Sequence, residues 1–425
     1  MSKQMVQNVK GTRDFYPEDK AFMNWLYGKI RLVSERFGYQ EFDGPEIEYL
    51  DLYADKTSEE ILKEQAFTMQ DRDGRAIMLR PELTPTMARM VAARSQQLLK
   101  PIRWWYLGRC WRYEKPQRAR AREFFQWEIN ILGAESPEAD AEILALAAMF
   151  FKEIGLTPDE VVIRVSDRSY FNSVLEKNNI NSELYVPLLR IVDRKEKINQ
   201  EEFDESLRLE GLNDAQISGL NEYFQSKDFQ GSPWLVSVFK ALESYPGASD
   251  YILYDPTIAR GFDYYTRTVF EAWDRTRGLK RALFGGGRFD NLTETIGGER
   301  VPGVGMAPGD MPIKELLEQF DKKPLTLPKV ADVFVSVFNE DLLSKSIQCA
   351  SLLRANGIDT ECAVSTDVKL EKQLKYADQK GIVYFIIIGP DENTNNQVLV
   401  KNLIEKTQDT FRFDESAAVI LSKLR

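Results

Sequence analysis

Basic side chains are concentrated in one stretch of the chain, residues 103–123. Seven of these residues are Lys or Arg and two are Glu, a local excess of five positive charges in a chain whose formal net charge is −10. Residues 115–122 (KPQRARAR) are mostly polar, and their second residue is a proline. Both features are typical of a loop. Such a reversal of charge predicts a site for a polyanion; a solvated basic hairpin is the alternative.

The residues on either side of this loop predict two strands of a long hairpin. Residues 104–107 and 124–131 are aromatic and β-branched runs. Within the second run Gln126, Glu128 and Asn130 alternate with apolar residues, so one sheet face carries three amide or carboxyl groups beside the arginine-rich loop. The many aromatic residues argue against a merely exposed hairpin.

The chain of 425 residues contains no histidine. This excludes Ser–His and Cys–His catalytic pairs and every metal held by imidazole. Its three cysteines, Cys110, Cys349 and Cys362, have no short spacing and indicate neither a disulfide framework nor a thiolate metal site. Any catalysis must therefore rest on arginines, carboxylates, tyrosine hydroxyls, bound metal ions or the substrate's own groups.

Other segments combine polar residues with turns or strands. Glu82 and Thr84 are two apart on a predicted strand, so they share a face on which a carboxylate can hold an ammonium group. Residues 285–287 are three glycines, which permit either close approach of a ligand or a tight bend. Asp290 follows them and is expected to orient Arg288.

A chain of 425 residues is long enough for two or three domains, each with its own core. Residues 170–245 are rich in charged helical patterns and read as a helical insertion. Residues 321–329 (DKKPLTLPK) contain two prolines and little to bury, which indicates a linker. Beyond it a βαβαβ pattern predicts a small α/β domain with a mixed sheet. The strands and helices expected here are 331–338, 342–355, 359–363, 369–379, 382–388, 398–400 and a terminal helix.

Several segments resemble the histidyl-tRNA synthetases, a family of class II aminoacyl-tRNA synthetases. The hairpin resembles motif 2 of that class. The resemblance covers about residues 9–425, with 170–245 matching least. Its other motifs are KGTRDFYP at 10–17, RPELT at 80–84, RGFDYY at 260–265 (RGLDYY in the family), GGGRFDNL at 285–292 and, less closely, KQLKYAD at 372–378.

The resemblance implies an α+β fold, with a class II antiparallel sheet flanked by helices, a helical insertion and a C-terminal α/β anticodon-binding domain. It implies a homodimer, with Pro45 in the dimer-forming motif 1. The corresponding expected ranges are 1–169 and 249–320 for the catalytic domain, 170–248 for the insertion, 321–329 for the linker and 330–425 for the anticodon-binding domain.

The resemblance also implies roles for individual residues. Arg112 and Arg260 would hold the α-phosphate of ATP from two sides, and Arg260 would stand where other class II enzymes place a metal. For Arg112 the alternative is an ion pair with Glu114, and for Arg260 a cap on the strand 251–258. The remaining expected ATP ligands are Glu114, Gln117 and Arg120, and the expected histidine ligands are Glu82, Thr84, Gln126, Asn130, Tyr264, Tyr265 and Gly286.

Two positions depart from the family. Asn130 stands where the family has an acid near the imidazole, although Glu128 lies on the same face. In motif 3, Pro312 stands where the family has an arginine against ATP. Either another cation takes over, with Arg118, Arg300 and Lys314 as candidates, or ATP binding is weakened.

The resemblance implies activation of histidine by ATP to histidyl-adenylate, then transfer to tRNA(His). Mg²⁺ would be held by the phosphates and a few carboxylates, without a metal site built by the protein alone. The alternative is a non-catalytic paralogue such as the regulatory subunit of ATP phosphoribosyltransferase, which the missing motif 3 arginine favours. No apolar run spans a bilayer, and the first residues lack a signal segment, so we expect a cytoplasmic protein without a membrane partner.

Overall fold

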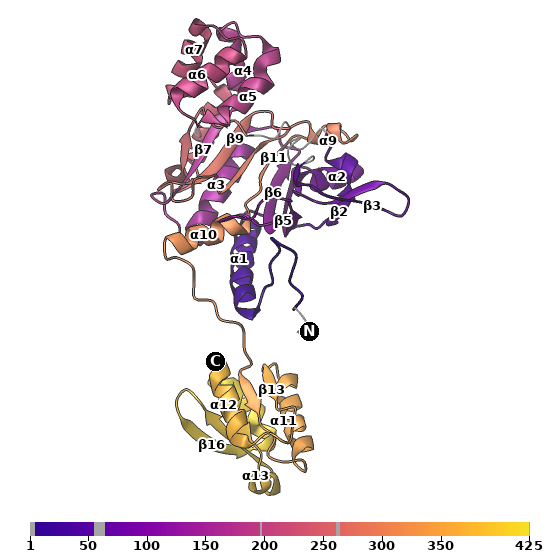
Figure 1. Cartoon of the computed structure of the whole chain (residues 1–425). Coiled ribbons are helices and arrows are strands. Elements are labelled where there is room, and N and C mark those ends of the chain that lie inside the picture. The colour runs from indigo at the N-terminus through magenta and orange to yellow at the C-terminus, as the bar shows by residue number, and fades with distance from the viewer. Residues whose placement is uncertain (1–4, 55–63, 196–197, 261–263, 425) are drawn as a thin grey trace. The chain divides into compact units, whose positions relative to one another are not determined.

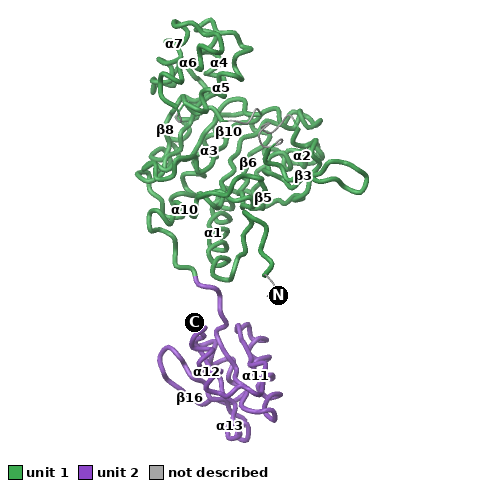
Figure 2. Tube along the Cα trace, viewed as in Figure 1, with its two compact units in different colours: residues 1–326 green, residues 327–425 purple. Residues whose placement is uncertain are grey.

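The computed structural model describes residues 5–54, 64–195, 198–260 and 264–424. Contacts divide the chain into two compact units, Met1–Thr326 and Leu327–Arg425 (Figure 2). The division falls inside the two-proline segment 321–329. Within the described ranges, no helix has the length and apolar character that crossing a bilayer requires.

The first unit is built on an eight-stranded sheet in the order β1-β5-β6-β11-β10-β9-β7-β8 (Figure 1). The two end pairs, β1–β5 and β7–β8, are parallel, and all the pairs between them are antiparallel. The predicted α+β class with an antiparallel sheet is thus confirmed. The strands are β1 Gln40–Glu41, β5 Ile102–Trp111, β6 Glu123–Leu132, β11 Gly303–Met306, β10 Phe284–Arg288, β9 Thr268–Asp274, β7 Val161–Asp167 and β8 Ile252–Tyr254.

One face of this sheet forms the main core. Trp105, Trp127 and Ile129 on the hairpin strands are fully buried against helices α1 (Pro17–Arg36) and α3 (Pro137–Glu153). Because neighbouring side chains on a strand point to opposite faces, the alternating polar residues of β6 lie on the other face. The alternation predicted from the sequence of 124–131 therefore positions the site.

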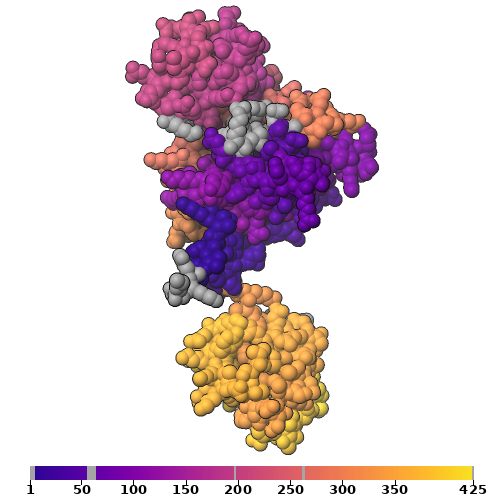
Figure 3. Space-filling view, turned by 45° about the vertical axis from the view of Figure 1, so that its right-hand side comes forward, coloured from indigo at the N-terminus to yellow at the C-terminus, as the bar shows by residue number. Residues whose placement is uncertain are grey.

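A cluster of four helices forms a separate lobe of the first unit (Figure 3). Its apolar residues, from Phe171 to Phe224, pack mainly against one another. Helix α8 (Pro233–Leu242) instead contributes Leu235, Val238 and Leu242 to the main core and packs against α3. The part with its own core is therefore shorter than the predicted insertion of 170–248. The four helices are α4 Arg168–Lys177, α5 Tyr185–Val192, α6 Gln200–Leu209 and α7 Asp214–Gln225.

A small antiparallel sheet, β2-β4-β3, adjoins helix α2 (Thr84–Arg94). Strand β4 ends at Leu79, so Glu82 lies in the connection and Thr84 is the first residue of the helix. The expectation that Glu82 and Thr84 share a face of one strand is wrong. Pro85 favours a helix start rather than a strand, because proline is well accommodated in the first helical turn. The other two strands are β2 Ile47–Tyr49 and β3 Phe67–Gln70.

The second unit has a five-stranded mixed sheet with helices on both faces. Helices α11 and α14 bury residues against one face, and α12 covers the other. The sequence did not indicate β16, because its residues are polar and exposed and carry no apolar alternation. The strand order is β13 (Thr360–Cys362), β12 (Val333–Val335), β14 (Tyr384–Ile387), β15 (Gln397–Asn402), β16 (Thr407–Arg412), and the helices are α11 Leu343–Ala355, α12 Leu370–Lys380 and α14 Ser416–Leu424.

Candidate active site

A cavity of about 1170 Å³ opens in the first unit between the hairpin loop, the central strands and the helical lobe. Its described walls carry an excess of positive charge, although the whole chain is acidic. A concave basic surface with low-dielectric walls concentrates anions. The basic lining residues are Arg112, Arg120, Arg168, Arg190, Arg194, Arg260, Arg277, Lys280 and Arg281, and the acidic ones are Glu82, Glu114, Asp193 and Glu271.

Most of the predicted site residues lie in these walls. Four do not: Thr84, Gln117, Asn130 and Gly286. Gln117 is exposed at the hairpin tip, where its backbone pairs with that of Arg120. The eight predicted residues that line the cavity are Glu82, Arg112, Glu114, Arg120, Gln126, Arg260, Tyr264 and Tyr265.

Arg112 directly follows β5 and is held in place from two sides. Its Nε donates to the carbonyl of Pro81 at 2.9 Å, and its guanidinium carbon lies 5.3 Å from the centre of the Phe124 ring. Glu114 forms its ion pair with Arg120, with Arg120 Nε and Glu114 Oε2 2.8 Å apart. The described contacts of Arg112 therefore leave its planar fork oriented by a carbonyl and a ring.

Arg260 adopts a left-handed backbone conformation, with φ of 60°, which is uncommon for a residue with a Cβ. Its Nη1 donates to Glu271 Oε1 at 2.9 Å. Burial alone would lower the pKa of Arg260, but the neighbouring Tyr265 and Glu271 raise it above its usual value. The motif residues 261–263 that follow lie outside the described part of the chain.

Arg168, at the start of α4, holds the segment that carries Arg260. Its Nε donates to the carbonyl of Ala259 at 3.0 Å, its Nη2 to that of Arg260 at 2.6 Å and its Nη1 to that of Tyr265 at 3.1 Å. Sequence reasoning missed Arg168, because nothing local distinguishes it from the other arginines of the chain. Its role depends on a contact with a segment far along the chain.

A compact polar cluster lies beside Glu82. Tyr264 Oη donates to Glu82 Oε2 at 3.4 Å. Thr84 Oγ1 and Asn130 Nδ2 both donate to Glu128 Oε1, each at 2.8 Å. Burial raises the pKa of Glu128 to about 8, and these two hydrogen bonds act in the opposite direction. Thr84 and Asn130 thus contact Glu128 rather than the cavity.

The glycine strand β10 makes room at two different places. An added Cβ at Gly285 would lie 2.3 Å from the guanidinium carbon of Arg260, so the missing side chain accommodates that arginine. At Gly286 the Cβ would lie 2.3 Å from the carbonyl oxygen of Gly305 and 2.4 Å from the ring of Phe270, inside the sheet and core. Gly285 lines the cavity, whereas Gly286 permits close packing of the sheet.

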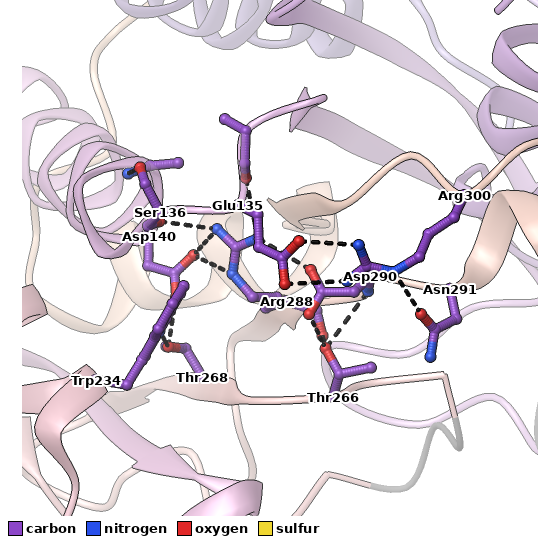
Figure 4. A network of polar contacts seen from close by, with 12 residues as sticks. Glu135, Ser136, Asp140, Trp234, Thr266, Thr268, Arg288, Asp290, Asn291 and Arg300 are labelled. Carbon is purple, nitrogen blue, oxygen red and sulfur yellow. Dashed lines mark hydrogen bonds and ion pairs between the residues drawn. The ribbon is translucent and has the colours of Figure 1, made fainter.

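Arg288, at the end of β10, belongs to a buried polar network (Figure 4). Its Nε and Nη2 donate to Asp140 Oδ1 at 2.9 and 2.6 Å, and its Nη1 to Asp290 Oδ1 at 3.0 Å. Asp140 also accepts hydrogen bonds from Thr268 and Trp234. Asp290 does orient Arg288, and the network ties α3 and α8 to the central strands.

The motif 3 segment brings no cation to the cavity. Met311 and Pro312 line it, and Asp310 is buried against Arg13, with Arg13 Nη2 and Asp310 Oδ2 2.9 Å apart. None of the three substitutes that the sequence offered lies in the cavity wall. Arg118 pairs with Glu315, Arg300 pairs with Glu135, and Lys314 lies elsewhere on helix α10 (Asp310–Gln319).

The described side chains do not form a metal site by themselves. Within the described ranges, no group of three or more acidic or cysteine residues is arranged to hold an ion.

Two family models together match most of the chain. The family model "Histidyl-tRNA synthetase" matches residues 11–309, and "Anticodon binding domain" matches residues 332–423. A histidine–tRNA ligase of Leptospira biflexa is 34% identical over 99% of both chains, and one of Haloarcula marismortui is 35% identical over 95% of both.

Two solved structures share the fold at 22% identity. A histidyl-tRNA synthetase from Nostoc sp. PCC 7120 covers 99% of this chain and 100% of its own, with a TM-score of 0.77. A Bacillus halodurans protein described as an ATP phosphoribosyltransferase regulatory subunit/histidyl-tRNA synthetase covers 88% and 97%, with a TM-score of 0.70. Because the first family model spans more than half of the chain and relatives at 34–35% identity align along nearly all of it, the chain belongs to the histidyl-tRNA synthetase family.

Proposed function

We propose that the chain activates histidine with ATP to form histidyl-adenylate and then transfers the histidyl group to tRNA(His). Membership of the family supports this activity along nearly the full length of the chain. The observation that carries the assignment of the site is the convergence of Arg112, Arg260, Glu82 and Tyr264 on one cavity, although they come from distant segments.

In the first step the histidine carboxylate attacks the α-phosphorus of ATP, and pyrophosphate leaves. The attacking oxygen is already ionised near neutral pH, so the step needs no imidazole base. Arg112 and Arg260 stabilise the negative charge that develops on the α-phosphoryl oxygens. Glu114 and Arg120, on the same hairpin, contact the nucleotide, and Gln117 at the exposed tip is available to tRNA or to phosphates that reach beyond the cavity.

Histidine is bound in the same cavity, beside the hydrogen-bonded pair Glu82 and Tyr264. Glu82 holds its α-ammonium group, Gln126 contributes an amide, and Tyr264 hydrogen-bonds to the imidazole with Tyr265 packed behind it. The two tyrosine rings are 4.7 Å apart between centres. Thr84 and Asn130 act through Glu128, whose carboxyl they orient, and Gly286 keeps the sheet beneath the site closely packed.

The rival function, a regulatory paralogue without catalysis, is supported by the lack of an arginine at position 312. Two features favour the enzyme over this rival. The two predicted catalytic arginines line one cavity, and the second unit matches an anticodon-binding family model.

Three further features complete the proposal. Mg²⁺ accompanies ATP. The protein acts in the cytoplasm. It forms a homodimer through the segment around Pro45, where Ile47 and Tyr49 on β2 are about half exposed. Sedimentation of the full chain tests the dimer.

ATP–pyrophosphate exchange, assayed with each of the twenty amino acids in turn, tests the function. Exchange that depends on histidine alone is expected. Exchange with another amino acid, or none with any of them, would overturn the proposal.

A further inference from the structure

The cavity contains an arginine that neither the motifs nor the expected substitutes for motif 3 pointed to. Arg281 lies in the connection between β9 and β10 and lines the cavity with Arg112 and Arg120. This connection is anchored to helix α10, because Asp274 Oδ2 accepts hydrogen bonds from Leu279 N and Gln319 Nε2, both at 2.8 Å. The connection that carries Arg281 is therefore tied to the helix in which Pro312 stands in place of the motif 3 arginine.

The guanidinium of Arg281 is only partly satisfied. Its Nη2 donates to the carbonyl of Ala119 in the hairpin loop. Its Nε and Nη1 are buried and have no hydrogen-bond partner among the described residues. A buried cationic donor without an acceptor is costly, because it has lost water and gained nothing in return.

The charges around Arg281 increase this cost. Burial first, and then the positive charges of Arg120 and Arg112, lower the pKa of Arg281 to about 10, while Glu114 acts in the opposite direction. Glu114 is already paired with Arg120. Arg281 thus lies close to two other guanidinium groups, and a multiply charged anion would relieve their mutual repulsion.

We propose that Arg281 binds the terminal phosphates of ATP and so supplies the cation that is missing at Pro312. The inference rests on the proposed function, since it assumes that ATP occupies this cavity. Arg112 and Arg260 are assigned to the α-phosphate, which leaves the β- and γ-phosphates for the arginine that lies beside the hairpin loop. Its fork can present two donors to phosphate oxygens while the third nitrogen keeps the loop in place.

A purely structural role predicts a different result. If Arg281 served only to tether the loop at Ala119, its loss would disturb Arg112 and Glu114 and would weaken every nucleotide alike. If it contacts the terminal phosphates, its loss weakens ATP but not AMP. The ratio of the two affinities therefore separates the roles.

The test compares the full chain with Arg281→Gln and a control, Arg275→Gln, which removes one positive charge from an exposed position of the same connection outside the cavity wall. Calorimetric titration without histidine measures the Kd for ATP with Mg²⁺ and for AMP. We expect Arg281→Gln to weaken ATP by about 10- to 100-fold, the range for a lost hydrogen bond to a charged group, and AMP by less than about twofold. Arg275→Gln should change both by less than about threefold.

Each other outcome overturns the inference. An unchanged Kd for ATP in Arg281→Gln, or an equal loss for ATP and AMP, would do so while leaving the proposed function intact. Equal losses of ATP affinity in Arg281→Gln and Arg275→Gln would mean that general charge rather than this fork is responsible. If the parent chain bound neither nucleotide, the proposed function itself would fail, and the inference with it.

Discussion

Three features of the structure hold the side chain of Arg260 in one position. Its left-handed backbone, its ion pair with Glu271 and the absence of a side chain at Gly285 all fix the same guanidinium. Strained backbone of this kind persists only where the surrounding structure enforces it, and it is concentrated at functional sites. The structure thus favours the catalytic interpretation of Arg260 over that of a strand cap.

Replacement of Arg260 by lysine is expected to keep the fold and the affinity for histidine but to lose most adenylate formation. An ammonium group cannot reproduce the planar fork beside a reacting phosphorus, and loss of such stabilisation costs about 10²- to 10³-fold in rate. Pyrophosphate exchange measures the effect, and Arg267→Lys, outside the cavity, is the control. Comparable exchange in Arg260→Lys and the parent would contradict the role.

Because Glu128 is buried, we expect the free energy of unfolding to depend on pH. Because its pKa rises on folding from 4.5 to about 8, the unfolded chain releases this proton at lower pH than the folded chain does. The residue therefore destabilises the fold progressively as pH rises from about 4.5 to 8, by up to a few kcal/mol. Glu128→Gln can keep both hydrogen bonds at Oε1 without this penalty.

The Tm of Glu128→Gln should consequently be close to that of the parent at pH 4.5 and increasingly higher toward pH 8. Thermal unfolding of both proteins across this range measures the difference. Parallel Tm curves would show that Glu128 ionises in the folded protein as readily as in the unfolded chain.

At the scale of elements, two neighbouring glycines of strand β10 have different roles. Gly286 permits close packing of the sheet, and Gly285 makes room for Arg260 in the site. Gly285→Ala meets the end of a flexible arginine side chain, which can move, so the fold should survive while Arg260 is displaced. Gly286→Ala meets a backbone carbonyl and a buried ring, which cannot move without opening the sheet. Overpacking of that kind typically costs about 1–3 kcal/mol.

We therefore expect Gly285→Ala to lose pyrophosphate exchange by at least about tenfold with little change in Tm, and Gly286→Ala to unfold several degrees earlier. Exchange and thermal unfolding, measured on both variants, test the pair. A lower Tm in Gly285→Ala than in Gly286→Ala would refute this division.

At the scale of the whole molecule, the two units predict separable activities. A chain that ends at Thr326 retains the entire cavity, since all its described lining residues lie before the division. It should form adenylate as the full chain does and charge tRNA poorly. Aminoacylation compared with exchange measures this, and full charging by the shortened chain would exclude an anticodon-reading role for residues 327–425.

The sequence by itself determined which polar residues of the second hairpin strand share one face of the sheet. Side chains on a strand alternate strictly, so the pattern in 124–131 assigned Gln126, Glu128 and Asn130 to one face without knowledge of the rest of the fold. It also located Arg112 and Arg260, because each lies within a short family motif. These are local properties that a single segment carries.

Only the tertiary structure decided which residues close the cavity. Arg281 contacts Ala119, 162 positions away, and Arg168 contacts the carbonyl of Arg260, 92 positions away. In the tertiary structure Gly285, and not the predicted Gly286, lines the cavity. The candidate substitutes Arg118, Arg300 and Lys314 do not line it. Periodicity and motifs describe neighbours along the chain, whereas the position of a guanidinium between distant segments depends on how the sheet and the helical lobe pack.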